Sequence, residues 1–249
     1  MSLHPLAEGF ASVADSYDRG RPDYTPAAIG ALMAELRLQP GSAVLDLAAG
    51  TGKLTRALLA ADLDVLAVEP QGPLRDRLVA NVGPERVREG LAEAIPLPSA
   101  AVDAVTVADA FHWFDQAAAL AEIARVLVPG GGLAVIATVP DWSGASWAHE
   151  VGSLLAELRP EHPSFDGRPW QDAVRASNRW SEPRELHVTS TQPASPERVL
   201  DHVASISWMA ALPEDERADA IAQVRVLVEE GQTPSELSVH FVLGLTELA

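Results

Sequence analysis

The chain has 249 residues, of which 47% are hydrophobic and 21% charged, a composition typical of a globular protein with a substantial core. Its formal net charge of −17 argues against nucleic acid or an anionic membrane as a partner. It has no cysteine, which excludes disulfides, thiolate nucleophiles and cysteine-based metal sites and suits a cytoplasmic protein. We expect no secretory signal and no transmembrane segment, because the first residues lack an apolar run and later apolar stretches are too short.

Two hydrophobic periodicities alternate along the first 140 residues. Short apolar runs bounded by turn residues predict buried strands, and longer segments with a period of 3.6 residues predict helices. In chain order the predicted elements are helices over 8–18 and 26–37, a strand over Ala43–Leu47, a helix over Lys53–Ala61, a strand over Asp64–Val68, a helix over Pro73–Asn81, strands over Arg86–Glu89 and Ala101–Val107, a helix over Gln116–Val128, a break at Pro129–Gly132 and a strand over Leu133–Val139. This order predicts an α/β fold whose sheet is mostly parallel and covered by helices on both faces.

Beyond residue 139 the pattern is less regular. Residues 141–184 predict a mostly helical insertion, whose tryptophans either line an apolar pocket or pack the insertion onto the sheet. The predicted elements that follow are strands over Arg184–Thr191 and Leu237–Leu245 and helices near 196–206 and 214–229. No linker marks a second domain, so we expect one domain over 1–249, with helices in 1–40, a core in 41–140, the insertion in 141–185 and the last strands and helices in 186–249.

The segment from Val44 to Thr55 is the most informative part of the chain. A hydrophobic strand carries Asp46 near its end and enters a turn of small residues that contains Gly50 and Gly52. Small residues let a ligand approach the backbone, and the N-terminus of the following helix offers unpaired N–H groups. The next strand is followed by Glu69, and an acid at that place suits the two hydroxyls of a ribose. The two strands therefore predict a nucleoside-binding unit at the carboxyl edge of a parallel sheet.

The same turn argues against two phosphate-binding motifs. A dinucleotide fingerprint needs a third small residue, and Thr55 stands in its place. A P-loop needs serine or threonine after its lysine, whereas Lys53 is followed by Leu54. The carboxyl group of Asp46 instead favours a ligand with a cationic amino group.

Five segments in order resemble the class I S-adenosylmethionine-dependent methyltransferases, and within them a bacterial small-molecule branch with an FHWF motif. The segments are Ser16–Pro22, Asp46–Gly52 together with Glu69, Gly90–Pro98, Val102–Val105 and Val126–Gly132. The resemblance implies a Rossmann-like, doubly wound sheet of seven strands with the last antiparallel, an N-terminal helical lid over the cofactor, and an insertion after strand five on the substrate side. A Rossmann-like domain that binds another ligand remains the alternative.

By this resemblance the cofactor is S-adenosylmethionine, held by residues from several turns. Asp46 and the backbone of the glycine turn would hold its methionine part, and Glu69 the ribose. Pro70 would lie near the adenine, and Ala92 and Glu93 would line the adenine pocket. The implied cofactor-binding residues are Tyr17, Arg21, Asp46, Ala48, Gly50, Gly52, Glu69, Pro70, Ala92, Glu93 and Asp109. Tyr17 and Arg21 would lie near the methionine carboxylate, or else pack and pair with a surface acid. The chain departs from the family at Leu91, where an aspartate is common, and at Ala48, where a glycine is common.

The acceptor is expected beside the motif Phe111–Phe114, which follows the fourth predicted strand. By resemblance Trp113 offers one N–H donor and a flat wall to the acceptor. His112 either acts as the general base or has a structural or cofactor-contacting role. Phe111 either binds substrate or forms a hydrophobic lip with Phe114.

These residues predict methyl transfer to a small-molecule acceptor, preferably at oxygen, as in a carboxylate or hydroxyl. The alternatives are a catalytically silent S-adenosylmethionine-binding partner or regulatory protein and, less favoured, an NAD-dependent oxidoreductase. No metal is expected, because the histidines are dispersed and His149-Glu150 lacks the second histidine of a zinc-protease helix. The identity of the acceptor and the oligomeric state are not encoded in any motif.

Overall fold

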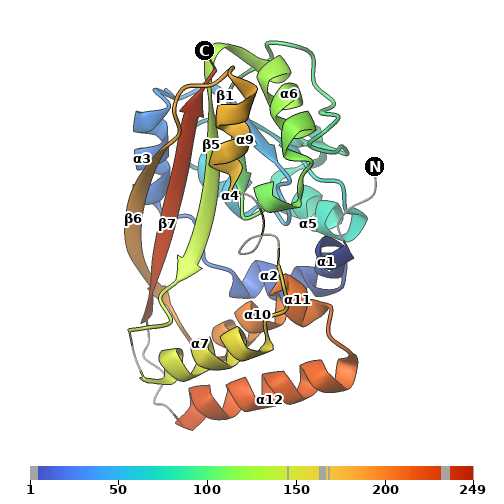
Figure 1. Cartoon of the computed structure of the whole chain (residues 1–249), viewed down its shortest axis with the longest axis vertical. Coiled ribbons are helices and arrows are strands. Elements are labelled where there is room, and N and C mark those ends of the chain that lie inside the picture. The colour runs from blue at the N-terminus through green and yellow to red at the C-terminus, as the bar shows by residue number, and fades with distance from the viewer. Residues whose placement is uncertain (1–4, 145, 163–166, 168, 231–235, 249) are drawn as a thin grey trace. The chain divides into compact units, whose positions relative to one another are not determined.

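The computed structural model describes residues 5–144, 146–162, 167, 169–230 and 236–248 (Figure 1). Seven strands form one sheet in the order β3-β2-β1-β4-β5-β7-β6, which confirms the predicted seven-stranded α/β fold. Neighbouring strands from β3 to β5 pair in parallel, whereas the arrows of β5 and β7 point in opposite directions (Figure 1). The strands are β1 (Ala43–Leu47), β2 (Asp64–Val68), β3 (Val87–Arg88), β4 (Val102–Ala108), β5 (Leu127–Pro140), β6 (Arg184–Pro193) and β7 (Glu236–Glu247).

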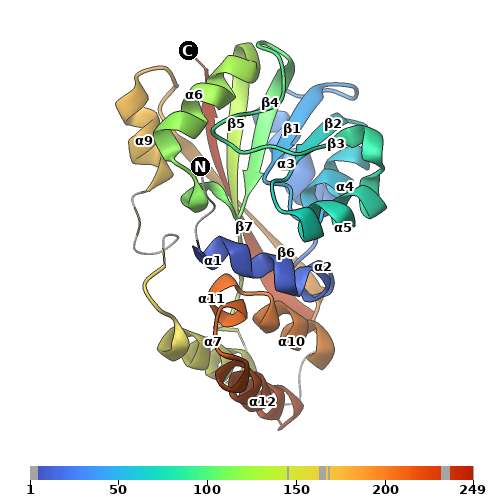
Figure 2. The same ribbon diagram turned by 90° about the vertical axis from the view of Figure 1, so that its right-hand side faces the viewer.

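Helices occupy most of the chain between these strands (Figure 2). The α-helices are α1 (Pro5–Glu8), α2 (Ala14–Gly20), α3 (Pro26–Glu35), α4 (Lys53–Leu59), α5 (Gly72–Val82), α6 (Gln116–Val126), α7 (Ser146–Leu158), α9 (Trp170–Ser177), α10 (Pro196–Ala204), α11 (Ser207–Ala210) and α12 (Glu214–Glu230). Three short 3₁₀ helices are η1 (Gly9–Val13), η2 (Pro84–Arg86) and η3 (Phe111–Trp113). The first of these and α2 form the predicted amino-terminal helical segment.

Helices cover both faces of the parallel strands. Successive side chains of a strand point to opposite faces of the sheet. In β2, Val68 packs in the cluster that contains the apolar face of α6, whereas its neighbour Ala67 packs against Leu78 of α5. These helices therefore lie on opposite faces, as the doubly wound arrangement requires.

The chain divides into two compact units. The first comprises residues 1–22, 139–166 and 189–240, and the second comprises residues 23–138, 167–188 and 241–249. Three of the five boundaries fall within β5, β6 and β7. The second unit contains β1 to β4 with α3, α4, α5, α6, α9, η2 and η3, and the first contains η1 and the remaining α-helices. The expected single domain over 1–249 with its four segments stays a prediction.

One predicted boundary is wrong. The segment Pro129–Gly132 was expected to break the chain before a strand over Leu133–Val139, but β5 is continuous from Leu127. The irregularity is absorbed as a register shift, in which Val102 pairs with Leu127 but Ala104 pairs with Gly132. Gly130, with φ of 77°, allows this bulge without ending the strand.

The first unit depends on a close approach of α2 to α10. Added to Gly20 at the end of α2, a Cβ atom would lie 2.1 Å from the backbone nitrogen of His202. Any residue with a Cβ atom would fit there only if one of the two helices moved. Beneath this crossing, a core built around Trp147, Val203 and Met209 joins α7, α10, α11 and α12.

We expect Gly20→Ala to destabilise the protein, because the added methyl overlaps backbone atoms that cannot rotate away. The cost should be about 1–3 kcal/mol or more, as for other overpacked sites. Gly30→Ala is the matched control, since Gly30 is helical and a Cβ there meets nothing within 4 Å. That control should gain up to about 1 kcal/mol from helix propensity. Urea unfolding measures the free energy of unfolding of both variants. If the two are equally stable, the close approach of α2 to α10 is contradicted.

Candidate functional site

The candidate site lies where three neighbouring parallel strands end. Because β1 pairs in parallel with both β2 and β4, the turns that follow these strands meet at one edge of the sheet. The structure thereby brings together, within the second unit, the residues predicted after each strand. These are Ala48, Gly50 and Gly52 after β1, Glu69 and Pro70 after β2, and Asp109, Phe111, His112 and Trp113 after β4.

The turn after β1 has an unusual backbone. Ala48, Gly50 and Gly52 all have positive φ, at 57°, 59° and 86°. Gly52 is glycine for a packing reason as well, because a Cβ there would lie 2.6 Å from Cδ1 of Leu78 on α5. Ala48 is the one residue of the three that has a side chain, and a side chain in this left-handed conformation costs about 1 kcal/mol or more of backbone strain. The turn is therefore held in one shape by the helices behind it.

Glu69 holds this turn to the end of β2. One carboxylate oxygen accepts from the backbone N–H of Gly50 at 2.9 Å, and the other accepts from the N–H of Gln71 at 2.9 Å. The residue is only 3% exposed. Burial raises the pKa of Glu69, and these two hydrogen bonds together with Arg75 act in the opposite direction. A carboxylate has about four acceptor positions, so two further donors, such as a pair of hydroxyls, fit its chemistry.

Asp46 points to the face of the sheet that packs on α4. Its Oδ2 accepts from the hydroxyl of Thr55 at 2.6 Å, and its Oδ1 lies 3.5 Å from the hydroxyl of Thr106 on β4. Complete burial raises the pKa of Asp46 to about 7, with the nearby charge of Glu69 acting in the same direction and the threonine hydrogen bonds opposing it. In this structure its carboxyl group fastens the first turn of α4 to the sheet.

The residues predicted at the adenine position lie in a tight turn after β3. Ala92 is buried, and Ala94 donates a backbone hydrogen bond to Leu91 at 3.1 Å. An oxygen of Glu93 accepts from the N–H of Asp115 at 2.9 Å, which ties this turn to the N-cap of α6. This hydrogen bond therefore attaches the turn after β3 to the connection between β4 and α6.

The residues after β4 separate into buried and half-buried side chains. Phe111 is 2% exposed and packs beside Phe114 and Trp170, with ring centroids 5.5 and 6.4 Å away. His112 and Trp113 are half-buried, and their rings lie 4.4 Å apart. Asp109 has φ of 51°, and its Oδ1 accepts from the N–H of Thr138 at 2.9 Å. The histidine and the indole are thus the members of this motif that offer polar atoms near the strand end.

Tyr17 and Arg21 belong to the first unit. The guanidinium of Arg21 lies 5.2 Å from the centre of the Tyr17 ring and donates to the hydroxyl and carbonyl oxygens of Ser205 at 3.0 and 3.1 Å. The aromatic ring of Tyr17 also contacts Phe10 edge-on. Their predicted contact with the methionine carboxylate stays a prediction.

Sequence reasoning missed several residues that shape the site. Thr55 and Thr106, which hydrogen-bond Asp46, were not singled out, nor was Arg75, which donates to the carbonyl of Pro70 at 2.7 Å. A signal existed for Thr55, since a hydroxyl in the first turn of a helix that follows a buried acid is well placed to bind it. No such signal existed for Thr106, which reaches Asp46 only through the pairing of β1 with β4.

The described part of the chain has neither a metal-binding cluster of side chains nor a membrane-spanning helix. No group of three or more histidine, aspartate or glutamate side chains there is arranged to hold a metal ion. No helix there is both long enough and apolar enough to cross a membrane.

Comparison with known proteins finds methyltransferases among the relatives in sequence, and a methyltransferase among the solved structures that share the fold. Residues 45–135 match the model of a methyltransferase domain. An uncharacterized methyltransferase of Mycobacterium tuberculosis is 37% identical over 229 residues, which cover 91% of this chain and 88% of the relative. A methyltransferase-like protein of Schizosaccharomyces pombe is 30% identical over 213 residues, covering 85% and 82%. A candidate type II methyltransferase of Anaeromyxobacter dehalogenans has a similar solved structure, with TM-score 0.62, 24% identity and coverage of 91% and 97%.

The buried carboxyl group of Asp46 predicts a pH dependence of stability. Its pKa is about 7 in the folded chain, above the ordinary 3.8 of the unfolded one, so the folded state retains a proton that the unfolded state has lost. The contribution of Asp46 to the free energy of unfolding is therefore largest below about pH 4. It falls by up to about 1.4 kcal/mol per pH unit as the pH rises, and it is lost at about pH 7.

Asp46→Asn should flatten this slope, because the amide has no proton to lose and can still accept from Thr55. Urea unfolding at pH 5 and pH 6.5 measures the difference. Asp76→Asn removes the same charge from an exposed position on α5 and should keep the wild-type slope. An unchanged slope in Asp46→Asn would contradict the assignment.

Proposed function

Because the chain belongs to the class I S-adenosylmethionine-dependent methyltransferases, we propose that it methylates a small-molecule acceptor, at an oxygen of a carboxylate or hydroxyl group. The observation that supports the methyl-donor part of this proposal is the buried carboxylate of Glu69, which accepts from the N–H groups of Gly50 and Gln71 at the shared end of parallel strands. Its remaining acceptor positions match the two hydroxyls of a ribose.

The residues that would hold S-adenosylmethionine divide the ligand among the three strand ends. Glu69 accepts from the ribose hydroxyls, with Pro70 beside the adenine, and the turn of Ala92 and Glu93 lines the adenine pocket. The glycine turn presents its backbone to the methionine part, and Asp46 keeps that turn in place through Thr55. We further propose that Asp109 lies at the cofactor and that Tyr17 and Arg21 contact the methionine carboxylate.

When bound, S-adenosylmethionine supplies a methyl group made electrophilic by the attached sulfonium. The chain itself has to align the acceptor oxygen with that methyl group, exclude water and accept a proton where the acceptor carries one. We assign proton removal to His112, because imidazole is the side chain that most often serves as a general base. The indole N–H of Trp113 orients the acceptor, and Phe111 supports the apolar wall beneath it.

The chemistry of the whole chain is consistent with this choice of acceptor. A net charge of −17 disfavours nucleic acid and anionic membranes as methyl acceptors. A chain without cysteine suits the reducing cytoplasm, where we expect it to act. A silent S-adenosylmethionine-binding protein would share the strand-end residues but show no turnover with any acceptor, and an NAD-dependent oxidoreductase would bind NAD instead.

Glu69→Gln should weaken binding of S-adenosylmethionine and S-adenosylhomocysteine by about 1.5–3 kcal/mol, or about 10- to 150-fold in Kd. The amide keeps one acceptor oxygen but loses the charge and the second one. Calorimetric titration measures both affinities, with NAD as a ligand that should not bind. Glu89→Gln is the control, since that carboxylate is 72% exposed and pairs with Arg75. Unchanged affinity in Glu69→Gln, or binding of NAD alone, would overturn the assignment.

His112→Ala should leave the affinity for S-adenosylhomocysteine within about twofold and lower turnover by about 10²- to 10⁴-fold, the usual contribution of a general base. The assay follows S-adenosylhomocysteine release over a panel of carboxylic acids and phenols. His187→Ala, at an exposed histidine of β6, should retain full turnover. A large loss of S-adenosylhomocysteine affinity in His112→Ala would make this residue a cofactor contact instead.

A further inference from the structure

Lys53 is the only lysine of the chain, and its charge is buried at an unfavourable place. It is the first residue of α4, directly after the glycine turn, and its side chain is only 7% exposed. A helix N-terminus disfavours cations, because the unpaired N–H groups give it a partial positive charge. Removal of an ammonium group from water is also costly. Lys53 therefore needs an anionic partner.

That partner is Asp23, in the segment between α2 and α3. The Nζ atom of Lys53 lies 2.5 Å from Oδ1 of Asp23. The side chain of Asp23 is 59% exposed, so the pair lies at the surface with its cation on the inner side. Residues 22–25 belong to no helix or strand, so side-chain contacts such as this one determine where the segment lies.

The neighbouring Tyr24 attaches the same segment at a second place. Its hydroxyl accepts from the hydroxyl of Thr138 on β5 at 3.4 Å, and its ring lies 5.7 Å from that of Phe241 on β7. The backbone N–H of Thr138 in turn donates to Asp109, directly after β4, at 2.9 Å. Asp23 and Tyr24, here called the strap, are therefore held both by the helix that follows β1 and by the strand that flanks the end of β4. All of these contacts lie within the second unit.

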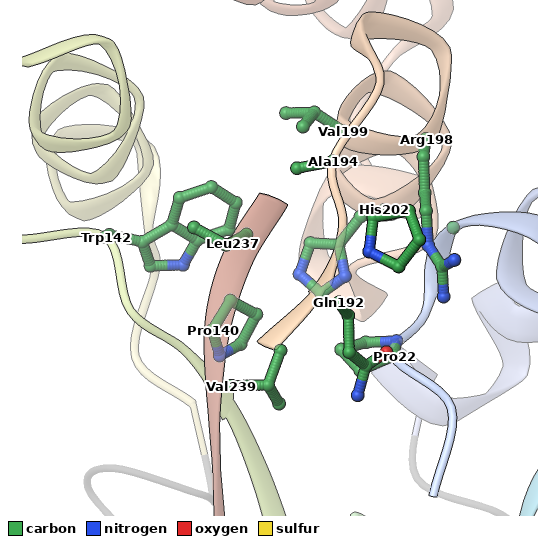
Figure 3. Close-up of a pocket in the computed structure, with 12 residues that line it drawn as sticks. Pro22, Pro140, Trp142, Gln192, Ala194, Arg198, Val199, His202, Leu237 and Val239 are labelled. Carbon is green, nitrogen blue, oxygen red and sulfur yellow. The ribbon is translucent and has the colours of Figure 1, made fainter. Parts of the chain in front are cut away.

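The chain that precedes the strap is held within the first unit. In this part of the sequence the boundary between the units lies between Pro22 and Asp23. The guanidinium of Arg21 donates to the hydroxyl and the carbonyl of Ser205 on the first unit's side of this boundary. Pro22 is buried in the wall of a small cavity, whose other lining residues include Trp142, Gln192, Arg198 and His202 (Figure 3). The chain is thus fixed immediately before the boundary by the first unit and immediately after it by Lys53.

The ion pair of Lys53 with Asp23 determines position more than stability. Its attraction is offset by the dehydration of the lysine and by the ordering of an exposed partner, and apolar replacements of such pairs are often tolerated. Arg21 precedes Asp23 by two residues, so by chain length alone their Cα atoms lie within about 7 Å of each other. An aspartate fastened to the start of α4 therefore limits the positions that the segment carrying Arg21 can take.

We propose that Lys53 is a positioning residue for S-adenosylmethionine, which acts through Asp23 and does not itself touch the ligand. The ion pair holds the strap at the helix that follows the glycine turn, and so sets where the segment of Tyr17 and Arg21 joins the second unit. This role rests on the proposed cofactor site and adds two residues to it. Because coupling is reciprocal, bound cofactor should in turn keep the ion pair closed.

The first test uses the wild-type chain. Acetic anhydride acetylates amines, and because the chain has one lysine, acetylation at lysine reports on Lys53 alone. Mass spectrometry of the peptide that contains Lys53 measures the rate. Saturating S-adenosylhomocysteine should slow this acetylation at least fivefold, because it keeps the ammonium paired and covered, whereas NAD should not change it. An unchanged rate with S-adenosylhomocysteine bound would overturn the proposal.

The second test is a double-mutant cycle. Lys53→Met and Asp23→Asn should each weaken S-adenosylhomocysteine binding at least fivefold in calorimetric titration. The double variant should bind within about twofold of the weaker single variant, because each substitution breaks the same ion pair. Lys53→Arg, which keeps the charge, should bind more tightly than Lys53→Met. If the two losses multiply, or if Asp23→Asn binds as the wild type does, Lys53 acts without Asp23 and the proposal is wrong.

Arg37→Met is the matched control for these variants. It breaks the ion pair of Arg37 with Glu247, at 2.7 Å in the same unit, but Arg37 lies before β1, away from the carboxyl ends of the strands. This variant should bind S-adenosylhomocysteine as the wild type does. If the wild type binds no S-adenosylhomocysteine, the proposed methyltransferase site is at fault and the role of Lys53 falls with it. If it binds, but Lys53→Met and Asp23→Asn keep the wild-type affinity, only the role of Lys53 is wrong.

Discussion

The carboxylate of Glu69 joins the pieces of chain on which the candidate site depends. It follows β2, accepts from the turn after β1 through the N–H of Gly50, and accepts from the start of α5 through the N–H of Gln71. Neither N–H belongs to a regular strand or helix ladder, so without this residue both would need another partner. A ligand that donates to the same carboxylate therefore binds to a group whose position is already determined by the backbone.

Asp46 and Glu69 are both buried carboxyl groups, but they have different hydrogen-bond partners. Both are almost completely buried, and burial raises the pKa of each. In both residues the hydrogen bonds oppose this rise, but Asp46 accepts from threonine hydroxyls, whereas Glu69 accepts from backbone N–H groups. Two acids at neighbouring strand ends thus differ in their hydrogen-bond partners, so the first suits a structural role and the second suits recognition of hydroxyl groups.

Parts of the site follow from sequence and parts do not. The glycine turn, Glu69 and the order of the strands were predictable, because each is a local pattern of small, acidic or apolar residues. The burial of Phe111 was not, since it depends on Trp170 of α9, far along the chain. Gly52 was expected to let a ligand approach, yet a Cβ added there would meet the side chain of Leu78. The structure thus adds to these residues packing reasons that a motif does not reveal.

The sequence by itself determined the alternation of strands and helices, the acids at the ends of the first two strands and the absence of cysteine chemistry, because periodicity and composition are properties of neighbouring residues. Only the tertiary structure decided that β5 runs unbroken through Pro129–Gly132, since its pairing with β4 continues beyond the extra residues of β5 with a shifted register. It alone placed Trp142, Gln192 and His202 around one cavity. Trp142 lies 50 positions before Gln192 and 60 before His202. No local pattern specifies which distant segments will pack together.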